Sequence, residues 1–179
     1  QMPGALIEPG SGSSIMGYAG ITGVNTNVQL HSDAYFNRYN ITPVQVNLIS
    51  KTCDIETAVT NNPPVIAVLP TYNIPKSTAF VLTASVTDPE NDPMTYNWEQ
   101  QDAATVIINK ANLGTTTSGA TFRSVAPSTS PTRYFPALAT VLSRTVSSPN
   151  TWEAVFSIAR TTEFSITARD NNAIPTQQL

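Results

Sequence analysis

The sequence predicts a protein built mainly of β-strands. Residues 80–87, 94–100 and 164–168 alternate apolar and polar side chains, as half-buried strands do. Composition points the same way, because only 12% of the 179 residues are charged and prolines number 14. That profile is typical of an extracellular β-rich module. We therefore expect a secreted or cell-surface protein that is long enough to bury a sizeable core.

Charge and hydropathy exclude two classes of partner. The formal net charge is −3 and no run of lysines or arginines occurs, which excludes a nucleic-acid surface. No apolar run approaches the roughly 20 residues that cross a bilayer, so no membrane span is expected. The first residues carry no basic, apolar secretion signal. We expect the chain to be an internal part of a longer secreted protein.

The strand pattern begins after a linker. Residues 60–64 read Thr-Asn-Asn-Pro-Pro, a composition typical of turns and stiff connections. We place a domain boundary there, with one region at 1–59 and a second at 60–179. A first strand is expected at 65–69, partly buried on both faces, followed by a bend near Pro75.

The next two strands face a common core. In 80–87 the inward residues are expected to be Phe80, Leu82, Ala84 and Val86, and in 94–100 they are Met94, Tyr96 and Trp98. An acidic, proline-rich turn separates the two strands. A strand, such a turn and a strand ending in Tyr-x-Trp is the layout of an immunoglobulin-like (Ig-like) antiparallel β-sandwich.

Later strands are less clear. Residues 164–172 read as a strand with Phe164, Ile166 and Ala168 inward, and a sandwich needs one more strand beyond it. We therefore expect a sandwich without its last strand, in a chain that is cut at both ends. Within 103–148 the sequence leaves alternatives open: 105–108 as a strand end, 112–120 as a loop, and 136–142 as a helical turn or a loop insertion.

The first region centres on a glycine-rich turn at residues 8–20. Four glycines and three serines there allow a tight reversal, and the reversal is expected to push Ile15, Met16 and Tyr18 into a core. Composition alone favours a simple Gly/Ser loop with a buried methionine. A short helix is expected at about 40–50, with Asn40 or Thr42 as its N-cap.

The order of residues in this turn indicates more. Residues 14–20 read Ser-Ile-Met-Gly-Tyr-Ala-Gly, and 32–36 read Ser-Asp-Ala-Tyr-Phe. Both stretches resemble the Met-turn and the segment after it in secreted bacterial reprolysin-like peptidases, which are metzincin zinc enzymes. The resemblance implies that 1–59 is the C-terminal tail of a metzincin-like catalytic domain, with Met16 and Tyr18 in the Met-turn and the short helix closing the domain.

Two departures from that family limit the resemblance. Thr22 stands where relatives carry a cysteine, so Cys53 has no partner in this chain. It either pairs with a cysteine upstream of the chain or is a buried free thiol, and we favour the free thiol. The zinc-binding motif His-Glu-x-x-His-x-x-Gly-x-x-His is absent, and the single histidine, His31, is expected at the surface. The resemblance implies zinc in the parent protein only. Its catalytic residues lie outside this chain, which should be inactive alone.

The second region also resembles a module of the same bacterial proteins. Residues 62–100 are similar to an Ig-like or PKD-like module that follows the peptidase. The matching motifs are Ile-Pro-Lys-Ser-Thr-x-Phe and Asp-x-x-x-Asp-Pro-x-Thr-Tyr-x-Trp-Glu-Gln. Further matching landmarks are residues 130–136 and 162–172. The resemblance implies an accessory module for domain spacing or for interaction with substrate or a cell surface.

Two acidic turns form a candidate calcium site. The expected ligands are Asp88, Glu90 and Asp92 in one turn and Asp170 in another, because calcium prefers six to eight oxygens from such groups. A solvated turn capped by its own Asx side chains explains the same residues, and the sequence favours that explanation.

The remaining chemistry gives little support for catalysis. One histidine without a nucleophile elbow does not make a Ser-His-Asp triad. A sugar-binding platform needs exposed aromatic residues, and the candidates are Tyr96, Trp98, Tyr134 and Trp152, of which the first two are expected in the core. The favoured function is therefore the non-catalytic part of a zinc metallopeptidase that acts on protein substrates. The alternatives are an adhesive or carbohydrate-binding sandwich that contacts an extracellular polymer, and a structural spacer.

Overall fold

The longest strands of the protein pair with each other. In the computed structural model, which describes residues 6–49, 51–52, 58–173 and 177–178, β4 (Met94–Gln100) runs antiparallel to β8 (Phe164–Asp170). Trp98 lies opposite Ile166 in this register. The short strand β9 (Gln177–Gln178) pairs with the other edge of β8. The strands expected at 94–100 and from 164 onward are confirmed, including the inward side chains Trp98, Ile166 and Ala168.

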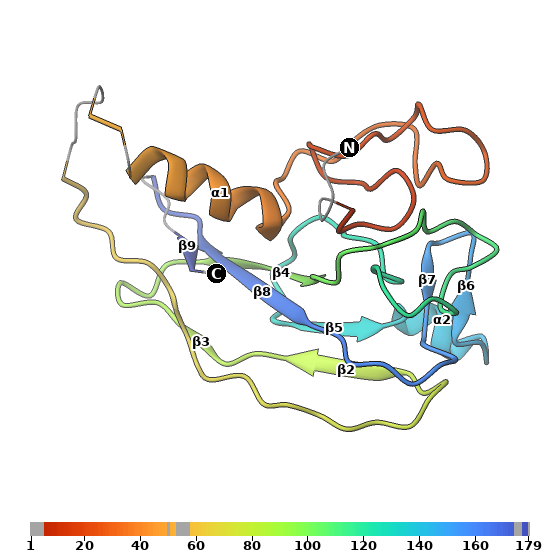
Figure 1. Cartoon of the computed structure of the whole chain (residues 1–179). Coiled ribbons are helices and arrows are strands. Elements are labelled where there is room, and N and C mark those ends of the chain that lie inside the picture. Colours follow the sequence, from red (N-terminus) through yellow and green to blue (C-terminus); the bar gives the residue numbers. More distant parts are fainter. Residues whose placement is uncertain (1–5, 50, 53–57, 174–176, 179) are drawn as a thin grey trace.

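A second sheet is formed by β2 (Phe80–Thr83) and β5 (Thr132–Phe135), which pair antiparallel with Phe80 opposite Phe135. Two further pairs are only two residues long in each strand. They join β1 (Val65–Ile66) to β3 (Val86–Thr87), and β6 (Ser147–Ser148) to β7 (Glu153–Ala154). Figure 1 shows β2 and β5 on one side of the β4–β8 pair.

The two larger sheets share one core. Trp98 and Ile166 from β4 and β8 pack with Phe135 from β5, and Phe122 joins them from the loop between. The rings are arranged as pairs, with Phe80 stacked on Phe135 at 5.1 Å between centroids and Phe122 edge-on to Phe135, also at 5.1 Å. Edge-on and offset contacts of this kind stabilise a core beyond the area that they bury.

Two expected strands differ from the structure. The stretch 65–69 forms only the two-residue strand β1, and Val68 is 98% exposed, so this stretch is not buried on both faces. The stretch 80–87 divides into β2 and β3, because Ala84 and Ser85 lie between the two pairings. Its inward face is nevertheless confirmed, since the even-numbered residues from Phe80 to Val86 pack on or in the core.

The region between 103 and 148 contains no long strand among its described residues. Residues 103–120 form turns and loops around a second, smaller core that includes Ile108, Leu113 and Trp152. Residues 112–120 are a loop, as expected. The helical alternative for 136–142 is confirmed, because α2 (Leu138–Leu142) occupies most of it. Leu6 and Val28 from the start of the chain pack against this second core.

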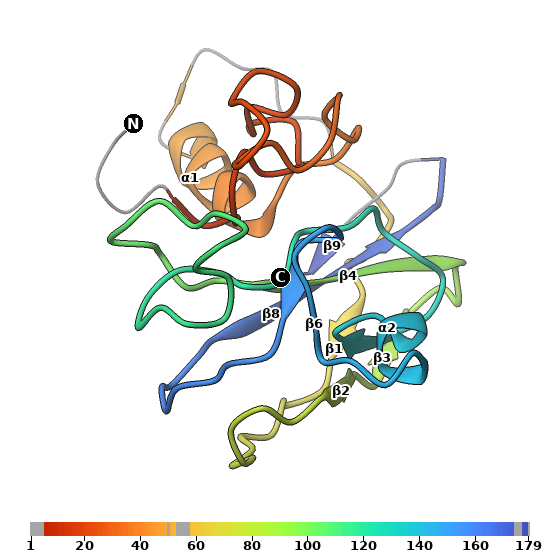
Figure 2. The same ribbon diagram turned by 90° about the vertical axis from the view of Figure 1, so that its right-hand side faces the viewer.

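The N-terminal segment, residues 6–49, covers one side of the β-rich part (Figures 1 and 2). It consists of loops followed by α1 (Arg38–Ile49). The helix begins earlier than expected, because the side chain of Asn37 accepts a hydrogen bond from Tyr39 N at 2.9 Å and acts as the N-cap. Neither Asn40 nor Thr42 is the cap, and Pro43 lies inside the helix.

The same segment corrects a prediction about burial. Ile15, Met16 and Tyr18 do not enter a core: the exposed fractions of Met16 and Tyr18 are 61% and 51%. None of the helices that the structure describes is long and apolar enough to span a membrane. Cys53 lies outside the described residues, as do residues 1–5.

Candidate functional site

The glycine-rich turn is organised around the side chain of Glu8. Its carboxylate accepts hydrogen bonds from the backbone N–H groups of Ser13 and Ser14, at 2.9 and 3.2 Å, and from the Ser14 hydroxyl at 2.5 Å. Gly12 has a φ of +71°, and a Cβ there would lie 2.9 Å from Glu8 Oε2. Glycine is therefore required at this position by both the backbone conformation and the close carboxylate.

Polar groups join this turn to the β-rich part. The Ser13 hydroxyl donates to the carbonyl oxygen of Ser124 at 2.6 Å, and the Ser124 hydroxyl donates to Glu99 of β4. The other oxygen of Glu99 accepts the backbone N–H of Arg38 at 2.8 Å. Glu99 is thus held between the N-terminal segment and the sheet, and only 1% of it is exposed.

Burial dominates the electrostatics of this contact. Loss of solvent raises the pKa of Glu99 to about 7, although the hydrogen bonds from Ser124 and Arg38 and the charge of Arg169 oppose the shift. Glu8 raises the pKa of Glu99 further by like-charge repulsion. Burial also raises the pKa of Tyr35 and lowers the pKa of Arg169, which lie in the same cluster. Glu99 and Ser124 are buried and line neither described cavity, whereas Glu8 lines the smaller one. The cluster serves as a contact between the two parts.

The described residues do not fit a catalytic zinc. His31 is exposed, as expected, and in the described residues no three His, Cys, Asp or Glu side chains lie close enough together to hold a metal ion. Zinc catalysis requires about three protein ligands around an open position. We derive no catalytic step through zinc for this chain.

The acidic turns do meet at one end of the β4–β8 pair. Met94 lies opposite Asp170, and the N–H of Asn171 donates to the carbonyl oxygen of Pro93. Within the first turn, Asp88 Oδ1 accepts the N–H groups of Glu90 and Asp92 at 3.0 and 2.9 Å, so Asp88 caps its own turn.

Amide side chains bind the other carboxylates of this end. Asn172 Nδ2 donates to Asp92 at 2.6 Å, Asn62 Nδ2 to Glu90 at 2.6 Å, and Asn61 Nδ2 to Asp170 at 3.0 Å. The four predicted ligands therefore come from turns that meet at one end, but among the described residues no three of these carboxylates lie close enough together to hold a metal ion. The buried Asp88 Oδ2 has no hydrogen-bond partner among the described residues.

The four aromatic candidates do not form a sugar platform. Trp98 and Trp152 are buried in different cores, Tyr96 packs against the first of them, and only Tyr134 is exposed. The indole of Trp98 donates to the carbonyl oxygen of Pro131 at 2.9 Å. These residues stabilise the fold.

A groove beside β2 is the larger of the two cavities described here. It has a volume of about 800 Å³ and lies between β2 and an extended stretch that we call the strap, residues 67–77. The strap is tied at both ends, by Ala67 N to Ser85 O at 2.9 Å and by Ser77 N to Phe156 O at 2.8 Å. Between these two hydrogen bonds, no backbone hydrogen bond joins the strap to β2 in the described residues.

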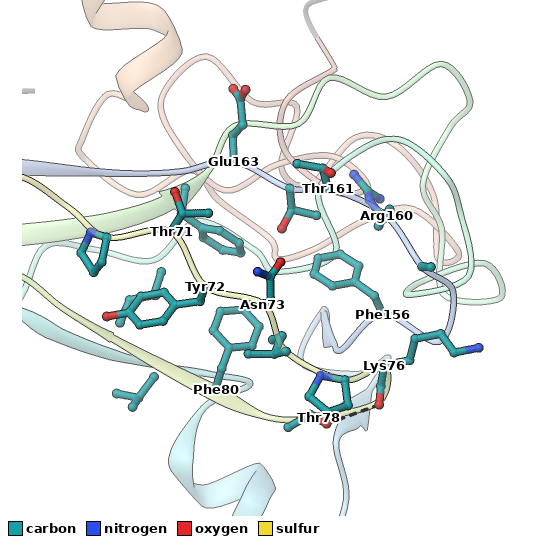
Figure 3. A pocket seen from close by; sticks show the side chains of 18 of the residues that line it. Thr71, Tyr72, Asn73, Lys76, Thr78, Phe80, Phe156, Arg160, Thr161 and Glu163 are labelled. Atoms are coloured by element: carbon teal, nitrogen blue, oxygen red, sulfur yellow. Dashed lines mark hydrogen bonds between the residues drawn. The ribbon is translucent and has the colours of Figure 1, made fainter.

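The floor of the groove is aromatic and its rim is charged. Phe80, Phe156 and Phe164 contribute half-buried rings, and Tyr72 projects from the strap (Figure 3). Lys76 and Glu163 are exposed at separate places on the rim and belong to neither ion pair found in the described residues. Arg160 also lines the groove, but it is held by Asp102 at 3.4 Å.

Sequence reasoning missed both the Glu99 contact and the groove. Glu99 lies near the end of a strand with alternating apolar and polar residues. The pattern does not predict its burial, because a glutamate suits a solvent-facing position equally well. The groove depends on where the strap leaves β2, for which the sequence offers only Pro70 and Pro75. Comparisons with protein-family models, with curated proteins and with solved structures find no match to this chain.

Proposed function

We propose that the chain is the non-catalytic C-terminal part of a secreted, reprolysin-like zinc metallopeptidase. In this proposal the N-terminal segment closes the catalytic domain, and the β-rich part is an Ig-like sandwich that serves as an accessory module. The zinc ligands and the peptide-cleaving residues belong to the parent protein outside this chain. The protein substrates are those of the parent enzyme.

The observation that carries the proposal is the set of exposed large apolar side chains in the N-terminal segment, which we call the apolar face. Monomeric proteins rarely expose large contiguous apolar patches, and a dense set of exposed apolar side chains marks a surface that packs against a partner. Here the exposed large apolar residues are Ile15, Met16, Tyr18, Ile21, Val24, Leu30, Phe36, Tyr39, Val44, Val46, Leu48 and Ile49.

The buried side of the segment combines a few apolar residues, among them Leu6 and Val28, with a larger polar group. Ser11, Ser13, Ser14 and Asn37 are all at least 95% buried, and Ser13 and Ser14 donate hydrogen bonds to the carboxylate of Glu8. A segment evolved to fold only onto the sheet would be expected to direct its apolar side chains inward. Most large apolar side chains of this segment are exposed instead, which supports a role as one layer between the sheet and a further apolar body, here the catalytic domain.

The sandwich part of the proposal is supported by the shared core. The β2–β5 pair and the β4–β8 pair contribute residues to the same aromatic cluster, with Trp98 among its most buried members. Two antiparallel sheets packed over such a core are the basis of Ig-like architecture.

The coding sequence upstream of Gln1 provides the first test. We expect it to encode a His-Glu-x-x-His-x-x-Gly-x-x-His run within one catalytic domain of the same reading frame. The protein extended through that domain should contain zinc and cleave an unstructured protein substrate, and removal of zinc should abolish cleavage. An upstream sequence without the run would refute the proposal and leave a binding module or a spacer.

The apolar face provides a second test in the extended protein. Replacement of Met16 and Leu48 by serine should destabilise the extended protein by about 2–5 kcal/mol per buried side chain, but should leave the isolated chain almost unchanged. Equal effects in the two proteins would contradict packing of this face on the catalytic domain.

Calcium at the acidic end of the β4–β8 pair is a separate proposal. The buried, unpartnered Asp88 Oδ2 supports it, because an oxygen of this kind suits a hard cation. Calcium at ten times its Kd should stabilise the folded protein by about 1.4 kcal/mol. A chelator that removes the bound calcium should lower the Tm. The Asp88→Asn variant should lose this response. A Tm that ignores both calcium and chelator contradicts the site.

A further inference from the structure

The free edge of β2 faces the groove. Ala84 N donates to the carbonyl oxygen of Pro131 on the β5 side at 3.2 Å. Hydrogen-bonded pairs alternate in antiparallel sheets, so Leu82 and Phe80 also direct their backbone groups toward β5. Val81 and Thr83 therefore direct both N–H and C=O away from β5, toward the groove.

These backbone groups have no partner on that side. The strap follows the β2–β3 edge as far as the Ala67–Ser85 hydrogen bond. Continuing that register would bring Leu69 to Thr83 and Thr71 to Val81, yet no hydrogen bond joins them in the described residues. All four residues of β2 line the groove, which therefore runs along the edge of the strand.

An unpaired strand edge is a template for another extended chain. The edge of β2 offers two N–H and two C=O groups with the two-residue repeat of a polypeptide backbone. The aromatic rings below the edge can contact alternate side chains of an added strand. The groove volume of about 800 Å³ lies within the usual range of ligand sites. Polysaccharides are usually bound by stacking on exposed flat rings, and Tyr72 is the one strongly exposed ring among the described groove residues.

We propose that the groove binds an extended polypeptide segment, which adds as a strand to the free edge of β2 and places a carboxylate beside Lys76. The ammonium group of Lys76, which joins no ion pair among the described residues, attracts the carboxylate of the peptide. Glu163, at a separate place on the rim, repels an acidic peptide residue that lies next to it. The inference does not rest on the peptidase origin, because every residue that carries it lies in the β-rich part.

Selection from a phage-displayed library of random dodecapeptides tests the proposal. We expect selected peptides to alternate apolar and polar residues and to carry an aspartate or glutamate near one end. Lys76→Glu should change that preference to lysine or arginine. A second screen measures binding to cellulose, chitin and peptidoglycan. If no peptide is selected but a polysaccharide binds, the groove is a polysaccharide site and the proposal is wrong. Absence of binding in both screens would also overturn it.

Two substitutions at one position separate the backbone edge from the side chain. Val81→Pro removes an N–H that faces the groove, which edge strands tolerate, and should weaken a selected peptide about tenfold. Val81→Thr retains the N–H and should keep the affinity within about twofold. Equal affinities for the two variants would refute strand addition.

Hydrogen exchange on the unmodified protein covers the case in which the proline variant fails to fold. The amide hydrogens of Val81 and Thr83 should exchange more slowly in the peptide complex, whereas Leu82, which faces β5, should change little. Protection of all three residues to the same degree, or of none, would contradict pairing at this edge.

Discussion

The N-terminal segment and the β-rich part place their apolar side chains in opposite ways. In the β-rich part, Trp98, Phe122 and Phe135 are at least 95% buried in one core. In the N-terminal segment, Met16, Ile21 and most apolar residues of α1 are exposed, and serines and carboxylates are buried instead. Apolar burial stabilises the β-rich part. Hydrogen bonds, together with the packing of Leu6 and Val28, anchor the N-terminal segment to it.

The two regions therefore differ in the interactions that stabilise them. Burying apolar area contributes about 25 cal/mol per Å² and tolerates little loss of packing. A buried hydrogen bond contributes about 1 kcal/mol, and leaving one partner unsatisfied costs about 1–3 kcal/mol. The β-rich part should therefore fold on its own contacts, and attachment of the N-terminal segment should depend on a few polar groups and on pH.

The largest expected effect comes from the aromatic core. Phe135→Ala removes a fully buried ring that stacks on Phe80 and meets Phe122 edge-on, so it should lower the free energy of unfolding by about 3–5 kcal/mol. Urea denaturation measures this loss. Phe36→Ala, at an exposed phenylalanine of the N-terminal segment, is the matched control, with a change of about 0.5 kcal/mol or less. Similar losses would show that the two regions do not differ.

The pH dependence of stability should follow Glu99. Its pKa is about 7 in the folded protein against an ordinary value of 4.5. Between those two values the folded state binds more protons than the unfolded state, so stability is fully present below about pH 4.5 and falls as the pH rises to about 7. The 2.5-unit difference corresponds to a loss of about 3 kcal/mol.

Glu99→Gln should remove most of this dependence, as measured by thermal unfolding from pH 4 to pH 8. Glu163→Gln removes one exposed carboxylate and thus matches the change in net charge. If the Glu99→Gln variant kept the wild-type slope, burial of this carboxylate would not be the cause.

A smaller effect is expected at the hydrogen bond between the two regions. Ser13→Ala removes the 2.6 Å hydrogen bond to the Ser124 carbonyl oxygen, which keeps only the longer bond from Arg123 Nε at 3.3 Å, and this loss should cost about 1 kcal/mol. Hydrogen exchange should show faster exchange in residues 11–37 and little change in β4 and β8. Uniform loss of protection across both regions would mean that they unfold as one unit.

The smallest effect on stability is expected at the apolar face. Met16→Ser should change the free energy of unfolding by about 0.5 kcal/mol or less, because the side chain is 61% exposed. The same variant should bind less of a dye that reports exposed apolar surface. Val68→Ser, at a 98% exposed valine of the strap, should leave dye binding unchanged, since that valine lies outside the apolar face. Equal dye binding by Met16→Ser and the unmodified protein would argue against an apolar face.

Several features followed from the sequence alone. Period-two alternation gave the inward faces of β2, β4 and β8, because each strand residue points to the opposite side from its neighbours. The predominance of strands, the loop at 112–120 and the presence of a helix near 40–50 also followed from local residue preferences. The start of that helix did not, because Asn37, Asn40 and Thr42 are all acceptable N-caps and the tertiary position of Arg38 N, bound to Glu99, selects the first.

The remaining features depend on tertiary structure. The glycines and serines of residues 8–20 predicted a tight turn, but whether Met16 faces a core depends on which bodies surround the turn. Glu99 is buried because Ser124 and Arg38, which are distant in sequence, supply its hydrogen bonds. The groove exists because the strap does not pair with the edge of β2, although local residue preferences would allow such pairing. Local preferences determine which way side chains alternate, whereas burial and open edges depend on segments that meet only after folding.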